Sequence, residues 1–173
     1  MINCPIRKFI HMFFPLKKYL ILGGITFTSV FLTFCQSDND ELDTQEWNRA
    51  NLTNYTSYPD PGSEECIEYN GCEWAGYFSF LDGQQTEEWV QEHNIIAIHS
   101  KDAEQYKLKT LRLRQGDHEI GAVVYDMCSD TDCDGCCTTN SAETGFLIDI
   151  EKYTMARFGS GEGIVEWRCL DCD

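Results

Sequence analysis

The stretch that decides the fold is Val-Val-Tyr-Asp-Met-Cys at residues 123–128, followed by a cysteine-rich run that ends at Cys137. Its β-branched and aromatic side chains favour a strand, and the cysteines that follow indicate a loop held by disulfides. The strand delivers one carboxylate, Asp126, to its end. Acids at strand ends are common functional positions, because the sheet fixes the backbone while the loop leaves one face open. Asp126 is therefore the leading candidate site residue, and the alternative is that it only caps a turn.

Outward from this strand, short extended segments alternate with turn signals. Leu111 and Leu113 alternate with Arg112 and Arg114, which is typical of a half-exposed strand. Several short strands in one domain predict a small, mainly β, closed barrel rather than a βαβ sheet. The other strands are expected at residues 55–58, 76–81, 95–98, 120–125 and 163–169, and two short helices at 86–94 and at 149–158, the second capped by Asp149.

The beginning of the chain has the pattern of an export signal. Lys17 and Lys18 precede an uncharged apolar run that ends at Phe34, which is too short for a confident membrane span. The run ends at Cys35, as in bacterial lipoprotein signals, whose cysteine becomes the lipidated first residue; ordinary secretion with Cys35 removed is the alternative. The expected organisation is a lipoprotein-type signal peptide over residues 1–34, an acidic flexible linker over 35–54 and the barrel domain over 55–173.

The charge of the chain limits its partners. The 173 residues carry a net charge of −16, and without the four basic residues of the signal peptide this becomes −20. Such an acidic body is repelled by nucleic-acid phosphates and by anionic lipids. We therefore expect no nucleic-acid partner, and contact with a membrane only through a lipid anchor. The expected partner is neutral or cationic, such as a glycan. The protein is expected to be a monomer. The expected location is the cell surface or outer membrane, or otherwise the medium after secretion.

Ten cysteines are too many for an ordinary reduced cytosolic protein. Apart from Cys4 and Cys35, eight remain, and in an exported domain an even set predicts up to four disulfides of open connectivity. Residues 130–134 also begin like a calcium loop, but Ser141 stands where the required Glu would be. The two Cys-x-x-Cys pairs are also compatible with a zinc site. Disulfides are favoured over both, with no metal and no cofactor, and the predicted disulfide cysteines are Cys66, Cys72, Cys128, Cys133, Cys136, Cys137, Cys169 and Cys172.

Four segments together resemble a known family. They are Val124-Tyr125-Asp126-Met127-Cys128, Gly145-Phe146-Leu147-Ile148-Asp149-Ile150, Gly163-Ile164-Val165-Glu166-Trp167 and Ile95-Ile96-Ala97-Ile98-His99-Ser100. The first three, in this order, are similar to the catalytic-type domain of expansins, and the fourth, earlier in the chain, looks like the central strand of bacterial expansins. The resemblance implies a six-stranded double-psi β-barrel, a fold shared with barwin-like proteins, rare lipoprotein A and family 45 glycoside hydrolases.

The resemblance also implies roles for two acids. Asp126 matches the acid on which expansin activity depends, which is the general acid in the related hydrolases. The segment Thr56-Ser57-Tyr58-Pro59-Asp60 resembles the hydrolase segment that carries the general base, so Asp60 is the candidate base. An inverting hydrolase needs two such carboxylates about 6.5–9.5 Å apart.

The function expected from these observations is non-hydrolytic binding or loosening of a cell-wall polysaccharide, such as cellulose, xyloglucan or peptidoglycan, in a groove that carries Asp126. One alternative is a glycoside hydrolase or lytic transglycosylase that uses Asp126 and Asp60. A second is a barwin-like defence module that binds protein or glycan. Aromatic faces stack on the C–H faces of sugars, whereas Trp167 is expected in the core. The candidate substrate-binding residues are Tyr58, Trp74, Tyr125, Ser57 and His99.

Overall fold

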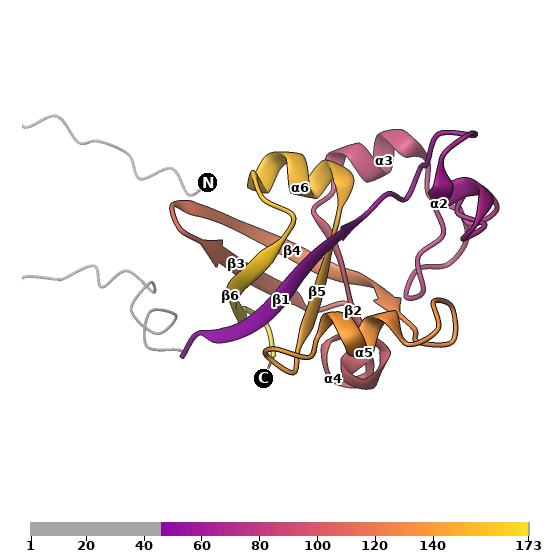
Figure 1. The fold of residues 1–173 in the computed structure, drawn as a ribbon. Helices are drawn as coiled ribbons and strands as arrows, with labels where there is room; N and C mark the ends of the chain where they lie inside the picture. Colours follow the sequence, from indigo (N-terminus) through magenta and orange to yellow (C-terminus); the bar gives the residue numbers. More distant parts are fainter. Residues whose placement is uncertain (1–45, 173) are drawn as a thin grey trace, which may run out of the picture. The chain divides into compact units, whose positions relative to one another are not determined.

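A computed structural model describes residues 46–172 (Figure 1). Its six strands close into a barrel in the order β1-β5-β2-β4-β3-β6. The pairs β1/β5 and β2/β4 are parallel and the other four pairs are antiparallel. The predicted closed, six-stranded, disulfide-rich barrel is confirmed. The strands are β1 (Asn48–Tyr55), β2 (Ile95–His99), β3 (Thr110–Gln115), β4 (His118–Cys128), β5 (Leu147–Glu151) and β6 (Gly163–Cys169).

The helices are short and lie outside the barrel. In Figure 1, α3 and α6 lie on one side of the strands, and α4 and α5 lie on the other. Two short helices were expected, and α3 and α6 occupy those positions; the other helical turns form in the connections between strands. The described helices are α2 (Glu64–Ile67), α3 (Glu87–Glu92), the 3-10 turn η1 (Ser100–Asp102), α4 (Ala103–Tyr106), α5 (Cys136–Asn140) and α6 (Lys152–Phe158).

Every second residue of each strand contributes to the core, because successive side chains in a strand point to opposite faces. Leu111 and Leu113 of β3 are fully buried in the barrel, as the sequence pattern predicted. The arginines between them point outward: Arg112 pairs with Glu119 at 3.1 Å and Arg114 with Glu166 at 2.9 Å. The core cluster takes apolar side chains from all six strands, so the residues that alternate with them along each strand point to the outer face.

Strand β1 begins seven residues earlier than the sequence suggested. Residues 48–54, which were assigned to the linker, pair with β5 and β6 and close the barrel. The prediction was wrong because the segment is mostly polar, and only Ala50 and Leu52 of β1 enter the core. Just before the strand, the Trp47 ring lies 4.0 Å from the guanidinium carbon of Arg114. The barrel therefore includes a stretch whose composition resembles a linker.

Strand β5 was missed, and the predicted cap of α6 was two residues off. Asp149 lies inside β5, whose neighbours Ile148 and Ile150 are in the core. Glu151 is the N-cap of α6: its carboxylate accepts from the backbone N–H groups of Tyr153 and Thr154. Glu151 is the last residue of β5, and its longer side chain reaches the free N–H groups in the first turn of α6, which a capping residue must satisfy. This leaves Asp149 free for another role.

The predicted aromatic strand at residues 76–81 is instead a series of turns. Gly76 has a φ of +74°, and a Cβ at this position would collide with the carbonyl oxygen of Gln85 and with the Tyr58 ring hydroxyl. Only glycine adopts such a conformation without strain. The segment still lies along β4, because the Phe80 N–H donates to the carbonyl of Tyr125 at 3.0 Å. It forms a wall beside the strand end rather than a seventh strand.

All eight cysteines of the described domain are paired, which confirms the disulfide prediction. Each bridge joins residues only three to nine positions apart, so each holds its own loop and none crosses the barrel. The carboxylate of Asp130, the first residue of the calcium-like run, accepts from the N–H of Thr138 at 2.9 Å and from its hydroxyl at 2.6 Å. These two bonds hold the pKa of Asp130 below its ordinary value. The bridges are Cys66–Cys72, Cys128–Cys137, Cys133–Cys136 and Cys169–Cys172.

Within residues 46–172, no helix is long and apolar enough to span a membrane. The predicted signal peptide and its Cys35 lie outside the described residues.

Candidate functional site

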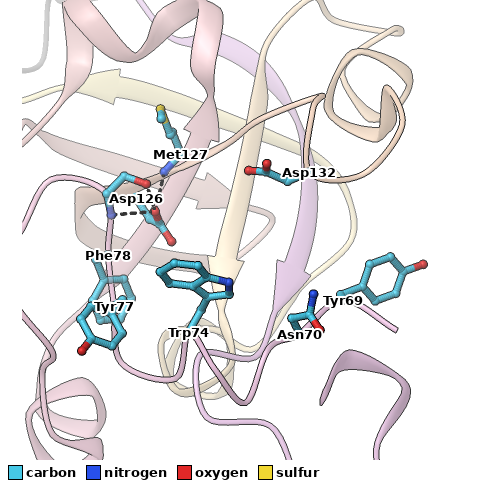
Figure 2. A pocket seen from close by; sticks show the side chains of 9 residues that line it. Tyr69, Asn70, Trp74, Tyr77, Phe78, Asp126, Met127 and Asp132 are labelled. Atoms are coloured by element: carbon cyan, nitrogen blue, oxygen red, sulfur yellow. Dashed lines mark hydrogen bonds between the residues drawn. The ribbon is translucent and has the colours of Figure 1, made fainter. Parts of the chain in front are cut away.

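A cleft with a volume of about 640 Å³ lies beside the end of β4 (Figure 2). One wall comes from the turns after α2, a second from β4, and a third from the disulfide-bonded loop that follows β4. Asp126 lines this cleft, as does Trp74, so two of the predicted site residues are brought together. The lining residues are Tyr69, Asn70, Trp74, Tyr77, Phe78, Ser79, Asp126, Met127 and Asp132.

A β-bulge sets the direction of Asp126. Strands β2 and β4 pair as Ile96 with Val124 and then Ala97 with Asp126, so Tyr125 is an extra residue in β4. Val124 faces the core, and strict alternation would have turned Asp126 toward the core as well. Bulges re-aim side chains in this way and are common near functional sites. The bulge at Tyr125 therefore places the carboxylate on the outer face, where it lines the cleft.

The Asp126 carboxylate is held by one of its two oxygens. Oδ1 accepts from the Ser79 N–H at 3.0 Å, the Ser79 hydroxyl at 2.6 Å and the Met127 N–H at 2.9 Å. Oδ2 has no hydrogen-bond partner among the described residues. Burial raises the pKa of Asp126 above its ordinary value and nearby Asp132 adds to this, while the hydrogen bonds from Ser79 and Met127 oppose it. One oxygen thus fixes the side chain and leaves the other for a ligand.

The aromatic wall of the cleft is unusually exposed. Trp74 is 65% exposed and Tyr69 54% exposed, and the rings of Trp74 and Tyr77 meet edge to face with centroids 6.1 Å apart. The Cys66–Cys72 disulfide closes the loop that carries Tyr69. Figure 2 shows the Trp74 ring beside Asp126, with Tyr69 and Asn70 farther along the same wall. Exposed aromatic rings beside a carboxylate match what sugar recognition requires, since the rings stack on sugars and the acid accepts from hydroxyls.

A second acid shares the outer face with Asp126. Ala97 of β2 pairs with Asp126 on one side and with Asp149 on the other, and Asp149 pairs in turn with Thr53 of β1. Paired residues point to the same face, so these four side chains form one row across four strands. With about 4.8 Å between neighbouring strands, the two acids stand about 10 Å apart at their Cα atoms. The small Ala97 side chain separates them without filling the space.

Asp149 is the most perturbed carboxyl of the row. Burial raises its pKa from 3.8 to about 7, the negative charges of Asp126 and Glu65 contribute, and the hydrogen bond from Thr53 opposes the rise. That bond, from the Thr53 hydroxyl to Oδ1, is 2.8 Å long. Asp149 does not itself line the cleft. It adjoins Asp126 as a carboxyl that holds a proton near neutral pH.

Tyr55 lies close to both acids. Burial raises the pKa of its phenol well above the ordinary value, and Asp126 and Asp149 are the next causes. Its hydroxyl is buried and has no hydrogen-bond partner within residues 46–172. The face that carries the two acids therefore includes an unsatisfied donor, which is uncommon in folded proteins.

The predicted general base does not join this group. Asp60 is exposed in the turn before α2, where its backbone carbonyl accepts from Gly62 and Ser63. It is not among the residues that line the cleft. Its neighbours in the sequence have structural contacts: the buried Ser57 hydroxyl donates to Glu151 at 2.8 Å, and the Tyr58 hydroxyl donates to the carbonyl of Gln85.

The other two candidate sugar-binding residues also lie elsewhere. Tyr125 packs against Trp89, with ring centroids 5.5 Å apart, in a small hydrophobic cluster outside the barrel. His99 is buried; its Nε2 lies 3.0 Å from the Thr138 hydroxyl, and its Nδ1 accepts from the N–H of Lys101. His99 thus connects β2 to the disulfide loop. Trp167 lies in the core, as expected.

Most residues of the cleft could not be predicted from the sequence, because they lie in loops. Asn70, Tyr77, Ser79 and Met127 carry no spacing pattern that marks them as neighbours. Asp132 was noted only as part of a calcium-like run. Asp149 had a usable signal: an acid between two isoleucines is the alternation of a strand with one polar face.

The sulfur atoms of Cys128, Cys133, Cys136 and Cys137 lie within 4.8 Å of one another. All four belong to disulfides, so they are not available as thiolate ligands in this form. The arrangement of the described residues therefore supports a ligand site at the cleft rather than a thiolate metal centre.

Compared with known proteins, the chain matches no protein-family model and no curated protein. The case for a function accordingly depends on the geometry of the cleft and on the resemblance of the sequence to expansins.

Proposed function

We propose that this chain is an exported, expansin-like protein with a double-psi β-barrel, which binds or loosens a cell-wall polysaccharide without hydrolysing it. The observation that carries the proposal is the position of Asp126, held at the cleft by Ser79 and Met127 with one oxygen open, beside the exposed ring of Trp74. Such a pair recognises a sugar through both its polar and its apolar faces. Because the fold already holds the carboxylate in place, less conformational freedom is lost when a ligand binds.

A non-hydrolytic role fits the arrangement of the acids. Hydrolysis needs a second carboxylate that activates water or attacks the sugar directly. Asp60 does not line the cleft and Asp149 adjoins it without lining it, so Asp132 is the only other acid among the lining residues, and Figure 2 shows it to the right of Asp126, across the opening. One well-held acid in an aromatic cleft can hydrogen-bond and distort a glycan chain while leaving its bonds intact.

The test is a binding and product assay on cellulose, xyloglucan and peptidoglycan. We expect the protein to sediment with at least one of them and to release no new reducing ends. Asp126→Asn removes the charge and keeps the shape, and loss of a charged hydrogen bond weakens binding by about tenfold. Asp117→Asn, in the exposed turn between β3 and β4, is the matched control and leaves binding unchanged. Absence of binding to every polysaccharide would refute the proposal.

A second function, inverting glycoside hydrolysis, is favoured by one observation. Asp126 and Asp149 stand on one face, about 10 Å apart at Cα, and the pKa of Asp149 is raised to about 7. A carboxyl that keeps its proton near neutral pH beside a second acid is the requirement for a general acid. New reducing ends that disappear in both Asp126→Asn and Asp149→Asn would establish this alternative over the non-hydrolytic one.

Export and lipidation at Cys35 belong to the same proposal, because a wall-binding domain has its substrate outside the membrane. The cystine content of the domain supports an oxidising location. Radiolabelled palmitate incorporation into the full chain, compared with Cys35→Ala, distinguishes a lipid-anchored protein from a secreted one.

A further inference from the structure

The charges around the cleft are all of one sign. Two of its nine lining residues, Asp126 and Asp132, are acids, and none is a lysine or arginine. Two further acids, Glu65 on α2 and Asp149 on β5, lie near the same region, because the charges of Asp126 and Glu65 both contribute to the raised pKa of Asp149. Burial also raises the pKa of Glu65. The cleft therefore concentrates negative charge without a cation of its own to offset it.

Each of the two lining acids has a free oxygen. Asp126 uses only Oδ1 for its hydrogen bonds, and Asp132 accepts one bond at Oδ1, from the Thr131 hydroxyl at 3.3 Å. Neither Oδ2 has a partner within the described part of the chain. Figure 2 shows both carboxylates above the Trp74 ring in the view, Asp126 next to the ring and Asp132 to the right of it. A cationic group bound in the cleft therefore faces two acids and a π face, each of which attracts a cation.

We propose that the polysaccharide taken by this cleft carries free amino groups, as a de-N-acetylated amino-sugar polymer does, with Asp132 as the residue that selects the protonated amine. This rests on the proposed function of the same cleft and names its substrate class. An ammonium group accepts no hydrogen bond and carries three donors, which matches the free carboxylate oxygens. A uronic acid is disfavoured for the converse reason, because its carboxylate would face two acids without a cation.

The acidity of the whole domain strengthens this selection but does not replace it. Residues 46–172 contain 24 Asp and Glu against nine Lys and Arg, and the resulting net charge of −15 attracts any cationic polymer at long range, an attraction that weakens as salt screens it. Contact within the cleft is different, since it needs the Trp74 ring and the carboxylates at hydrogen-bond distance. Substituting Trp74 and Asp132 one at a time distinguishes contact within the cleft from the long-range attraction.

The experiment compares two oligosaccharides of equal length, one built of glucosamine and one of N-acetylglucosamine, by calorimetry at a mildly acidic pH that protonates the free amine. The N-acetyl group removes the charge and keeps the sugar backbone. Hydrogen bonds to a charged group imply that the glucosamine oligomer binds about tenfold more tightly. Asp132→Asn abolishes this preference while binding of the N-acetylated oligomer persists, and Asp117→Asn, an exposed acid in the turn between β3 and β4, leaves both affinities unchanged.

Three results would overturn the inference. Equal or weaker binding of the glucosamine oligomer contradicts it directly, and a preference that survives Asp132→Asn removes the assigned residue. If Trp74→Ala leaves the binding of the glucosamine oligomer unchanged, the attraction belongs to the overall charge and not to the cleft. In each of these cases binding of a neutral glycan at the cleft would leave the proposed function standing, whereas failure to bind any glycan would refute both.

Discussion

Replacement of Asp149 by asparagine should remove a pH-dependent part of the protein's stability. The pKa of Asp149 is about 7 in the fold and returns to about 3.8 when the chain unfolds. A carboxyl whose pKa is raised by folding stabilises the folded state while it holds its proton, so its contribution is complete below about pH 4. It is lost as the pH rises through about 7, where the folded protein must ionise a buried acid beside Asp126.

The size of the effect follows from the two pKa values. At about 1.4 kcal/mol for each pH unit, the rise from 3.8 to about 7 corresponds to about 4 kcal/mol between acidic and alkaline conditions. Asparagine has the same size as aspartate and an oxygen that still accepts from the Thr53 hydroxyl, so the substituted side chain retains this contact without ionising. We therefore expect the unfolding free energy of Asp149→Asn to fall less with rising pH than that of the wild type, by up to this amount.

The assay is urea unfolding followed by tryptophan fluorescence, with the disulfides intact, at a series of values from about pH 4 to about pH 8. The wild type and Asp149→Asn should converge at low pH and separate as the pH rises, with the variant the more stable at the alkaline end. Asp117→Asn, an exposed acid in the β3–β4 turn, serves as the control and should follow the wild type. Parallel curves for the wild type and Asp149→Asn would refute the reasoning, because Asp149 would then titrate as an ordinary exposed acid.

Three further variants test the turn at Gly76, the cap of α6 and the Cys66–Cys72 disulfide. Gly76→Ala should destabilise the domain by about 3 kcal/mol in urea unfolding, because its φ is +74° and the new Cβ meets Gln85; an unchanged midpoint would contradict this close approach. Glu151→Ala should cost about 3 kcal/mol by leaving buried donors at the start of α6 unsatisfied, with thermal unfolding as the measurement. The double change Cys66→Ser with Cys72→Ser should cost about 2 kcal/mol and weaken glycan binding in calorimetry, and full affinity would show that the loop orders itself.

Much of the barrel could be predicted where one face of a strand is buried and the other is charged. The alternation of Leu111 and Leu113 with arginines located β3, and the apolar run at 95–98 located β2. The two-residue alternation does not identify a strand where pairing with neighbouring strands, and not composition, determines the structure. Strand β1 contributes only Ala50 and Leu52 to the core, so its composition resembles a linker, and β5 leads directly into α6, so its alternation was assigned to the start of the helix.

Only two residues of the candidate site, Asp126 and Trp74, could be predicted from the sequence. Asp126 could be selected because it follows a clear strand, and Trp74 because it stands near turns. The partners that make them a site come from elsewhere: Ser79 and Asp132 reach the cleft through loop conformations that two local disulfides and a positive-φ glycine fix. Such contacts between residues that are 47 positions apart, as Ser79 and Asp126 are, leave no periodic trace in the sequence.

The single extra residue in β4 has a consequence for any change in the length of this strand. Because Tyr125 has no partner across from it, deletion of Tyr125 would restore an uninterrupted ladder with β2 and keep Asp126 opposite Ala97, on the outer face. If β4 instead lost the bulge without losing a residue, Asp126 would pair with Ile98, and its carboxylate would enter the apolar core cluster, where an unpaired charge is costly to bury. The outward direction of Asp126 thus depends on Tyr125 having no partner in β2, and a homologue that lacks Tyr125 but keeps this pairing would still present the carboxylate on the outer face.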